Sequence, residues 1–264
     1  MRKKTNYPLI ITLIFLLVFG TSCKSKKQAD TSMAPLAQPI EIPEYEVGEL
    51  ILRQPGFTVS YNHALLVPNW VAYELTQEKL GSKEKRKADF CSDPQIKGRQ
   101  ADAADYKKSK WIKGQLVPPE DMNWDEEAWD ATYYFSNIAP QDKSFRSKSW
   151  LATEKMARRL AKEFGTVYVV CGPVFSEYKH GDIGDHKVSV PDAFFKAFLV
   201  NKDGRYHAIG LIMQNTPATQ SLKKCAQSID QVEEIIQRNL FPGLPQDAEA
   251  EVEAECDLKF WGIK

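Results

Sequence analysis

A glutamate on the buried side of a predicted helix is the first feature that points to chemistry. Between Trp150 and Phe164 the apolar residues fall on one helical face, which includes Ala157 and Leu160, and Glu154 falls on the same face. A buried carboxylate is costly unless it is paired with a cation, hydrogen-bonded or bound to a metal ion. Spacing alone leaves two alternatives open, a functional carboxylate or a structural ion pair with an Arg or Lys.

Two of the four histidines lie close together in the polar segment Lys179-His-Gly-Asp-Ile-Gly-Asp-His186. His180 and His186 could approach an active site or contribute to a metal site, but the segment supplies no third convergent ligand. The alternative is a surface loop whose histidines have no special role.

The cysteines fit no zinc-binding pattern. Apart from Cys23 there are four, an even number that suits an oxidising compartment, and none belongs to a Cys-x-x-Cys pair. Cys225 and Cys256 flank an acidic C-terminal segment, and we predict a disulfide between them. Cys171 lies in the apolar run Thr166-Val-Tyr-Val-Val-Cys171 and is expected to be a buried free thiol.

The elements that must position these residues are mixed strands and helices. One helix is predicted over 150–164, ending at Gly165, and another begins at the capping box Ser228-Ile-Asp-Gln231 and reaches about Asn239. A turn or loop is expected over 124–129, and Asn201-Lys-Asp-Gly204 predicts a hairpin. Strands are predicted over residues 57–61, 65–67, 70–75, 131–136, 166–174, 194–200 and 206–214. The irregular order favours an α+β fold over a doubly wound sheet.

The N-terminal residues are interpreted as a targeting signal. Positive residues precede the apolar run Pro8 to Phe19, which is too short for a comfortable membrane span, and Gly20-Thr-Ser-Cys23 follows. This resembles a bacterial lipoprotein signal over residues 1–22, with Cys23 as the lipidated residue; an ordinary cleaved signal peptide and an uncleaved anchor are the alternatives. We expect a flexible tether over 23–44 and a membrane-anchored location in the bacterial cell envelope.

Charge is segregated along the chain. The formal net charge is zero, and removal of residues 1–22 leaves 32 basic against 35 acidic residues, so the overall balance indicates no partner. Locally, residues 79–115 carry eleven Lys or Arg against five acids, and residues 143–162 carry seven against one. Residues 227–257 reverse the sign, with one Arg against nine acids. The two basic segments form either one positive surface or separate solvated faces.

A series of short segments occurs in one order and spacing, and together they resemble a known family. They are Gly56-Phe-Thr-Val-Ser-Tyr61, Pro68-Asn-Trp-Val-Ala-Tyr-Glu-Leu75, Asp105-Tyr106, the Trp111 loop ending in Leu116-Val-Pro118, Asp121-Met122, Tyr134-Phe-Ser-Asn-Ile-Ala-Pro-Gln141, Phe145, Trp150, Glu154, Val167-Tyr-Val-Val-Cys-Gly-Pro-Val174 and Val190-Pro-Asp-Ala-Phe-Phe-Lys196. Their order resembles the DNA/RNA non-specific endonuclease family. The resemblance implies a ββα-metal nuclease-like α+β fold, with a central, mostly antiparallel sheet flanked by helices, in a domain over 45–264.

The resemblance also implies metal-assisted hydrolysis of DNA or RNA without sequence preference. A divalent ion, typically Mg²⁺, is held by an Asn amide oxygen and waters, a His acts as general base, a Glu orients metal-bound water and Arg side chains neutralise the phosphate. Carried over position by position, Asn137 is the expected metal ligand, Glu154 the expected water-orienting residue and Arg86 an expected phosphate contact.

The pattern breaks at the general base. The family's Asp-Arg-Gly-His falls on Ile112-Lys113-Gly114-Gln115, so Lys113 keeps only a positive charge and Gln115 occupies the position of the base. A carboxamide cannot take a proton near pH 7, and general-base catalysis contributes about 10²–10⁴ in rate. After Phe145, where the family has Asn-Arg-Gly, this chain has Arg146-Ser-Lys148. Two hypotheses stay open: an impaired Mg²⁺-dependent endonuclease, and an inactive nuclease-fold lipoprotein that binds nucleic acid or an envelope partner.

Overall fold

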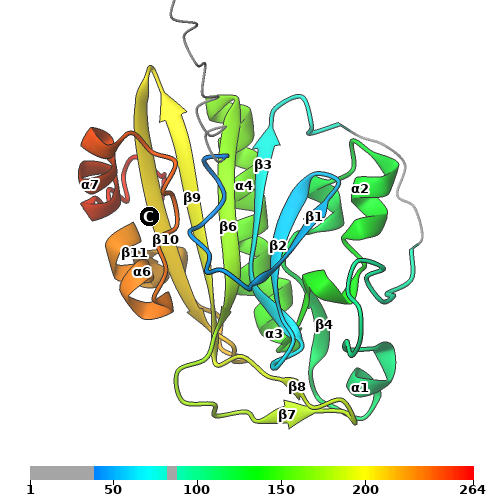
Figure 1. Cartoon of the computed structure of the whole chain (residues 1–264). Helices are drawn as coiled ribbons and strands as arrows, with labels where there is room; N and C mark the ends of the chain where they lie inside the picture. The colour runs from blue at the N-terminus through cyan, green and yellow to red at the C-terminus, as the bar shows by residue number, and fades with distance from the viewer. Residues whose placement is uncertain (1–38, 82–87) are drawn as a thin grey trace, which may run out of the picture. The chain divides into compact units, whose positions relative to one another are not determined.

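The computed structural model describes residues 39–81 and 88–264, which belong to one compact unit spanning Ala37–Lys264 (Figure 1). The predicted signal peptide, the lipidation site Cys23 and the predicted phosphate contact Arg86 lie outside the described residues. Ile42 is 2% exposed and packs in a core cluster, so the predicted tether extends a few residues too far. None of the helices in the described ranges is long and apolar enough to cross a membrane.

A seven-stranded sheet forms the centre of this unit, in the spatial order β1-β2-β3-β6-β9-β10-β11. Every neighbouring pair in it is antiparallel, which confirms the predicted α+β class. The strands are β1 (Leu50–Gln54), β2 (Phe57–Asn62), β3 (Val67–Thr76), β6 (Thr166–Val174), β9 (Ala193–Lys202), β10 (Arg205–Gln214) and β11 (Ala226–Gln227).

The β9–β10 hairpin confirms the turn predicted from sequence. Asp203 and Gly204 have φ values of 53° and 87°, the left-handed pair that a two-residue hairpin turn requires. The strand predicted over 65–67 is wrong, because residues 63–66 form a turn in which Leu66 has a φ of 57°, and β3 begins only at Val67.

Each face of the sheet packs against its own helices, as alternation along a strand requires. Val169 and Cys171 of β6 belong to the core shared with α4 (Leu151–Phe164), whereas Val170 belongs to the core on the opposite face. That second core includes Val232 of α6 (Ile229–Ile236) and Val252 of α7 (Gln246–Ala254). Figure 1 shows α4 running along the central strands and α6 and α7 beside β10.

The chemistry-bearing residues lie on a ββα unit attached to this sheet. Two short antiparallel strands, β4 (Ile112–Gln115) and β5 (Ile138–Gln141), form a ribbon. The chain then passes through α3 (Lys143–Phe145) and a π-helical turn, η3 (Arg146–Trp150), into α4. Gly114 on β4 lies against the Gln141 side chain so closely that a Cβ there would be 2.2 Å from Cδ of Gln141.

Short helices and a small second ribbon complete the unit. They are α1 (Ala103–Lys107), η1 (Pro119–Asp121), α2 (Glu126–Ala131), η2 (Phe135–Asn137), β7 (Asp182–Ile183), β8 (Val188–Ser189) and α5 (Leu222–Cys225).

The strand predicted over 131–136 is also wrong. Asp125 caps α2 by accepting a hydrogen bond from Ala128 N, and the helix then continues to Ala131. The following aromatic residues pack laterally, with Tyr133 and Phe135 both against Phe90, instead of pairing as a strand.

The predicted Cys225–Cys256 disulfide is wrong as well. Both residues are described and both are free thiols: Cys225 is buried in the sheet core at the end of α5, whereas Cys256 is exposed after α7. Cys171 is a buried free thiol as predicted, and burial raises its pKa to about 11.

Candidate nuclease site

Glu154 is buried in the first turns of α4, with only 1% of its surface exposed. Nη1 of Arg146 lies 3.1 Å from its Oε1, and the contact is an ion pair without hydrogen-bond geometry, because Oε1 finds no hydrogen-bond partner among the described residues. Burial raises the pKa of Glu154, and the positive charges of Arg146 and Lys196 oppose that rise. The structural ion pair left open by the helical spacing is therefore present.

A second cation, Lys196, acts on the same carboxylate. Its side chain is completely buried on β9, and Nζ lies 4.0 Å from the ring centroid of Trp150. Within the described part of the chain Nζ has no hydrogen-bond partner, so it interacts through the indole face and the charge of Glu154. One buried carboxylate thus faces two cations contributed by the chain itself.

Asn137, the predicted metal ligand, is hydrogen-bonded to the backbone through both ends of its amide. Its Oδ1 accepts a hydrogen bond of 2.9 Å from Val117 N, and its Nδ2 donates to Val117 O and Thr132 O, each at 2.9 Å. The residue is 0% exposed. These bonds fasten η2 to the segment after β4, so Asn137 acts as a structural bridge whose buried oxygen is not presented to an ion.

Gln115, in the place of the general base, is half-buried at the end of β4. Its Nε2 donates to Thr132 O at 3.0 Å, the same carbonyl that Asn137 uses. Its own backbone carbonyl accepts a hydrogen bond of 3.3 Å from Nε1 of Trp150, which ties the ribbon to η3. The carboxamide is therefore held in place, but it contains no group that can remove a proton from water.

Lys113 lies two residues before Gln115 and rests on aromatic rings. Its Nζ is 5.1 Å from the ring centroid of Phe90 and 5.8 Å from that of Tyr106. The charge is half-buried and near the ribbon, which fits a role in phosphate attraction and no role in proton transfer.

The two basic segments meet at one end of the β4–β5 ribbon. Ile112 at the start of β4 pairs with Gln141 at the end of β5, so the residues before β4 and after β5 lie at the same end. The basic residues there are Lys107, Lys108 and Lys110 on one side and Lys143, Arg146 and Lys148 on the other. The structure therefore favours one positive surface over two separate solvated faces.

The residues present do not fit a divalent ion at the position implied by the family resemblance. The amide oxygen of Asn137 already accepts a backbone N–H, and the carboxylate of Glu154 already faces Arg146 and Lys196. A divalent cation placed there would be repelled by two positive side chains, and the amide oxygen expected to hold it is fully buried. No step of a mechanism can be derived through a metal at this position.

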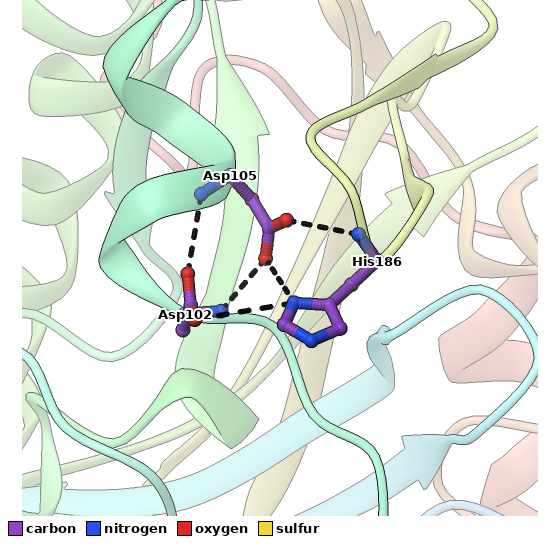
Figure 2. Close-up of side chains that lie close together, drawn as sticks. All are labelled: Asp102, Asp105 and His186. Carbon is purple, nitrogen blue, oxygen red and sulfur yellow. Dashed lines mark hydrogen bonds and ion pairs between the residues drawn. The ribbon is translucent and has the colours of Figure 1, made fainter.

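The histidine loop docks on α1. His186 N donates to Oδ1 of Asp105 at 3.1 Å, and Nδ1 of His186 lies 3.0 Å from Oδ2, which also accepts from Asp102 N (Figure 2). Burial raises the pKa of Asp105, but these hydrogen bonds outweigh it and lower the pKa overall.

Asp102, Asp105 and His186 have the composition of a metal-binding group, yet the oxygens of Asp105 are already engaged, so the cluster serves as a clamp. His180 packs its ring 4.9 Å from that of Trp111. In the described ranges His186 is held by Asp105 and His180 by Trp111, and neither forms a hydrogen bond with Gln115.

The sequence profile of the family described as DNA/RNA non-specific endonuclease matches residues 37–247, and the chain belongs to this family. Members of the family are divalent-metal-dependent nucleases.

Among the relatives, mitochondrial endonuclease G of Homo sapiens is 32% identical over 165 residues, which cover 58% of this chain and 56% of that protein. Mitochondrial nuclease EXOG of Xenopus laevis is 30% identical over 205 residues, or 72% of this chain and 57% of that protein. The chain thus spans little more than half the length of these curated relatives.

A solved structure of the EndoG/EndoGI complex, described as showing the mechanism of EndoG inhibition, resembles this chain with a TM-score of 0.70 and 25% sequence identity. The match covers 75% of this chain and 88% of the matched one. It confirms the predicted ββα-metal nuclease-like fold.

Two residues that shape the site were not assigned to it from sequence. Arg146 was visible only as a departure from the family pattern, and Lys196 only as part of a matching segment. A lysine in the otherwise apolar run 193–200 of β9 was the available signal, because an unpaired buried ammonium implies a nearby anion or aromatic face.

Proposed function

We propose that this chain is a nucleic-acid-binding member of the endonuclease family in which phosphodiester hydrolysis is severely impaired. The observation that carries the proposal is the ion pair between Arg146 and Glu154. The guanidinium of Arg146 neutralises the carboxylate of Glu154, which is the group that the family mechanism uses to orient metal-bound water.

The chemistry of Gln115 supports the same conclusion. Its Nε2 is directed at Thr132 O, and its oxygen can accept a hydrogen bond from water but cannot accept a proton. Loss of a general base alone raises the barrier by about 3–5 kcal/mol, the equivalent of about 10²–10⁴ in rate. The paired Glu154 adds a second, independent loss.

Binding of an anionic polymer is supported by the basic end of the β4–β5 ribbon. Exposed lysines from two segments stand at that end, and two carboxylates beside them are engaged: Asp105 binds His186, and Asp142 caps α3 through Ser144 N and Phe145 N. Asp182 and Asp185 line the same hollow as Lys107, Lys108 and Lys110 and offset part of their charge. Lysine contacts to phosphates carry no sequence information, so we expect binding to DNA and RNA without sequence preference.

The location is a separate part of the proposal. We infer export and lipid anchoring in the bacterial cell envelope from the apolar run before Cys23, which lies outside the described residues. Labelled fatty acid should be incorporated into the full chain and absent from Cys23→Ser. Incorporation that persists in Cys23→Ser would exclude Cys23 as the anchor.

The test of function uses the purified full chain with supercoiled plasmid, in MgCl₂, MnCl₂ or EDTA. We expect no metal-dependent nicking, together with binding of labelled duplex DNA that persists in EDTA and weakens as salt rises. Nicking that EDTA stops and that Glu154→Gln abolishes would show that an impaired but working metal-dependent nuclease is the right description. Absence of DNA and RNA binding at low salt would favour an envelope partner instead.

A further inference from the structure

An acidic cluster lies between α6 and α7, on the face of the sheet opposite to α4. One carboxylate oxygen from each of Asp230, Glu233 and Glu253 lies within 4.8 Å of the others. Asp230 and Glu233 come from α6 and Glu253 from the end of α7. Glu249, one turn before Glu253 on α7, adds a fourth negative charge that acts on both glutamates.

Glu253 is the member that points to a ligand. It is only 5% exposed, and its Oε1 has no hydrogen-bond partner among the described residues. A buried carboxylate oxygen with nothing to accept from costs free energy, and here it faces two further carboxylates instead of a cation.

A second orphaned acceptor lies at the same corner. Asn239 donates through Nδ2 to Oε1 of Glu249 at 2.9 Å, while its own Oδ1 is buried and lacks a partner within the described part of the chain. Oε1 of Glu233 already accepts from Leu240 N at 2.7 Å, which fixes that carboxylate beside the chain leaving α6.

The chain offers no cation to this cluster from its own neighbourhood. Arg238 is the single basic residue between positions 227 and 257, and it pairs with Glu49 at 2.8 Å on another element. Arg205 pairs with Glu251 and Glu255, which are exposed residues of α7 and its C-terminal end. The nearest positive side chains of the described ranges are thus engaged elsewhere.

We infer that Asp230, Glu233 and Glu253 form a binding site for a divalent cation between α6 and α7, with Ca²⁺ preferred over Mg²⁺. The donors are all hard oxygens, which suit both ions. Ca²⁺ takes about six to eight oxygen ligands in flexible geometry, whereas Mg²⁺ demands a near-ideal octahedron at about 2.0–2.1 Å. Side chains from two separate helices meet the looser requirement more readily.

The bound ion would join α7 to the rest of the unit. Val232 and Val252 supply the apolar contact of the two helices with the sheet, and the ion would remove the repulsion between the carboxylates directly beside it. This role is structural and does not depend on the proposed function of the nuclease site.

The experiment is thermal unfolding of the full chain, with CaCl₂, MgCl₂ or EDTA at matched ionic strength. For a dissociation constant of roughly 10⁻⁴–10⁻³ M, 10 mM CaCl₂ should raise the Tm by about 3–10 °C. MgCl₂ should raise it less. Hydrogen exchange should slow on adding Ca²⁺ over 229–254 and remain unchanged in β4 and α4.

Substitutions localise the effect. Glu253→Gln and Glu233→Gln should each abolish the Ca²⁺-dependent shift while folding normally, because they remove a repelling charge. Glu234→Gln, an exposed position on the same helix, is the matched control and should keep the shift. No Ca²⁺-dependent shift in the unaltered chain, or a shift that survives both Glu253→Gln and Glu233→Gln, would overturn the inference.

Discussion

Arg146 and Glu154 face each other across the junction of η3 and α4, with Nη1 3.1 Å from Oε1. Because Glu154 is 1% exposed, removing the guanidinium leaves a buried carboxylate with only Lys196 to balance it. We expect Arg146→Gln to lower the free energy of unfolding by about 3 kcal/mol, the lower end of the range for breaking a buried pair. Urea denaturation measures this. Arg205→Gln, at an exposed ion pair, is the control and should change stability by at most about 1 kcal/mol.

Restoring the base alone should not restore hydrolysis. In Gln115→His the imidazole can accept a proton, but Glu154 remains paired with Arg146. The combination of Gln115→His, Lys113→Arg and Arg146→Asn, which restores the family residue at three of the positions where this chain departs from the pattern, should produce EDTA-sensitive plasmid nicking at least about 10²-fold above Gln115→His alone. Equal activity of the single and triple variants would show that the ion pair does not limit the reaction.

Asn137→Ala should act on stability. It removes the partners of Val117 N and Val117 O in a fully buried setting, whereas Thr132 O keeps its hydrogen bond from Gln115 Nε2. An unsatisfied buried group costs about 1–3 kcal/mol, so two such groups should lower the free energy of unfolding by at least about 2 kcal/mol in urea denaturation, while DNA binding by the fraction that remains folded stays unchanged. A variant with unaltered stability would argue against the bridging role.

Nucleic-acid binding should follow the basic end of the ribbon. Removing Lys108, Lys110 and Lys148 together should weaken duplex DNA binding and reduce the slope of log K against log salt by about 0.9 for each phosphate that is no longer neutralised. Lys202 and Lys259 are exposed near Phe260 and the C-terminal end of α4, far from its start at η3, and serve as the control pair. An equal weakening by the two sets of substitutions would mean that binding reflects overall charge and not this surface.

The acidic cluster predicts an unusual pH dependence in metal-free buffer. Burial raises the pKa of Glu233 to about 7, with Asp230 and Glu249 adding to the rise and the hydrogen bond from Leu240 N opposing it. Burial, and then the charges of Glu233, Glu249 and Asp230, raise the pKa of Glu253 to about 8. Since the unfolded carboxyls titrate near 4.5, the folded state binds more protons between these values, and stability falls as pH rises from about 4.5 to 8.

Chemical denaturation in EDTA across this range measures the fall, and Glu253→Gln should flatten it. A metal-free protein whose stability rises steadily from pH 5 to 8, with no difference between it and Glu253→Gln, would contradict the assigned pKa shifts.

Local signals were sufficient for much of the fold. Periodicity and end signals, which the sequence displays directly, were enough to predict the helix before Gly165, the helix that begins at the Ser228 capping box and the strand 166–174. A strand was predicted over 131–136 because its aromatic residues have a high strand propensity. The cap at Asp125 and the contacts with the distant Phe90 favour a helix and a turn there instead.

The site was harder to predict because its decisive contacts are between residues distant in sequence. Glu154 was correctly expected on a buried face, but whether a metal or a cation of the chain balances it depends on η3 and on Lys196, which is 42 positions away along the sequence (196 − 154). Asn137 lies in a segment that matches the family, and only the structure shows that its amide is hydrogen-bonded to Val117 and Thr132. The cysteine pairing failed for the same reason, since spacing does not reveal which thiol is buried.

The close packing at Gly114 has a consequence for how members of this family are recognised from sequence. A Cβ at this position would lie 2.2 Å from the Gln141 side chain, so the ribbon closes only around a residue without one. The glycine of the Ile112–Gln115 segment is therefore required by assembly of the two strands, whether or not a base follows it. In screening sequenced genomes for working nucleases of this family, that glycine will select for proteins that fold, and the residues at the positions of Gln115 and Arg146 will separate those that cut from those that do not.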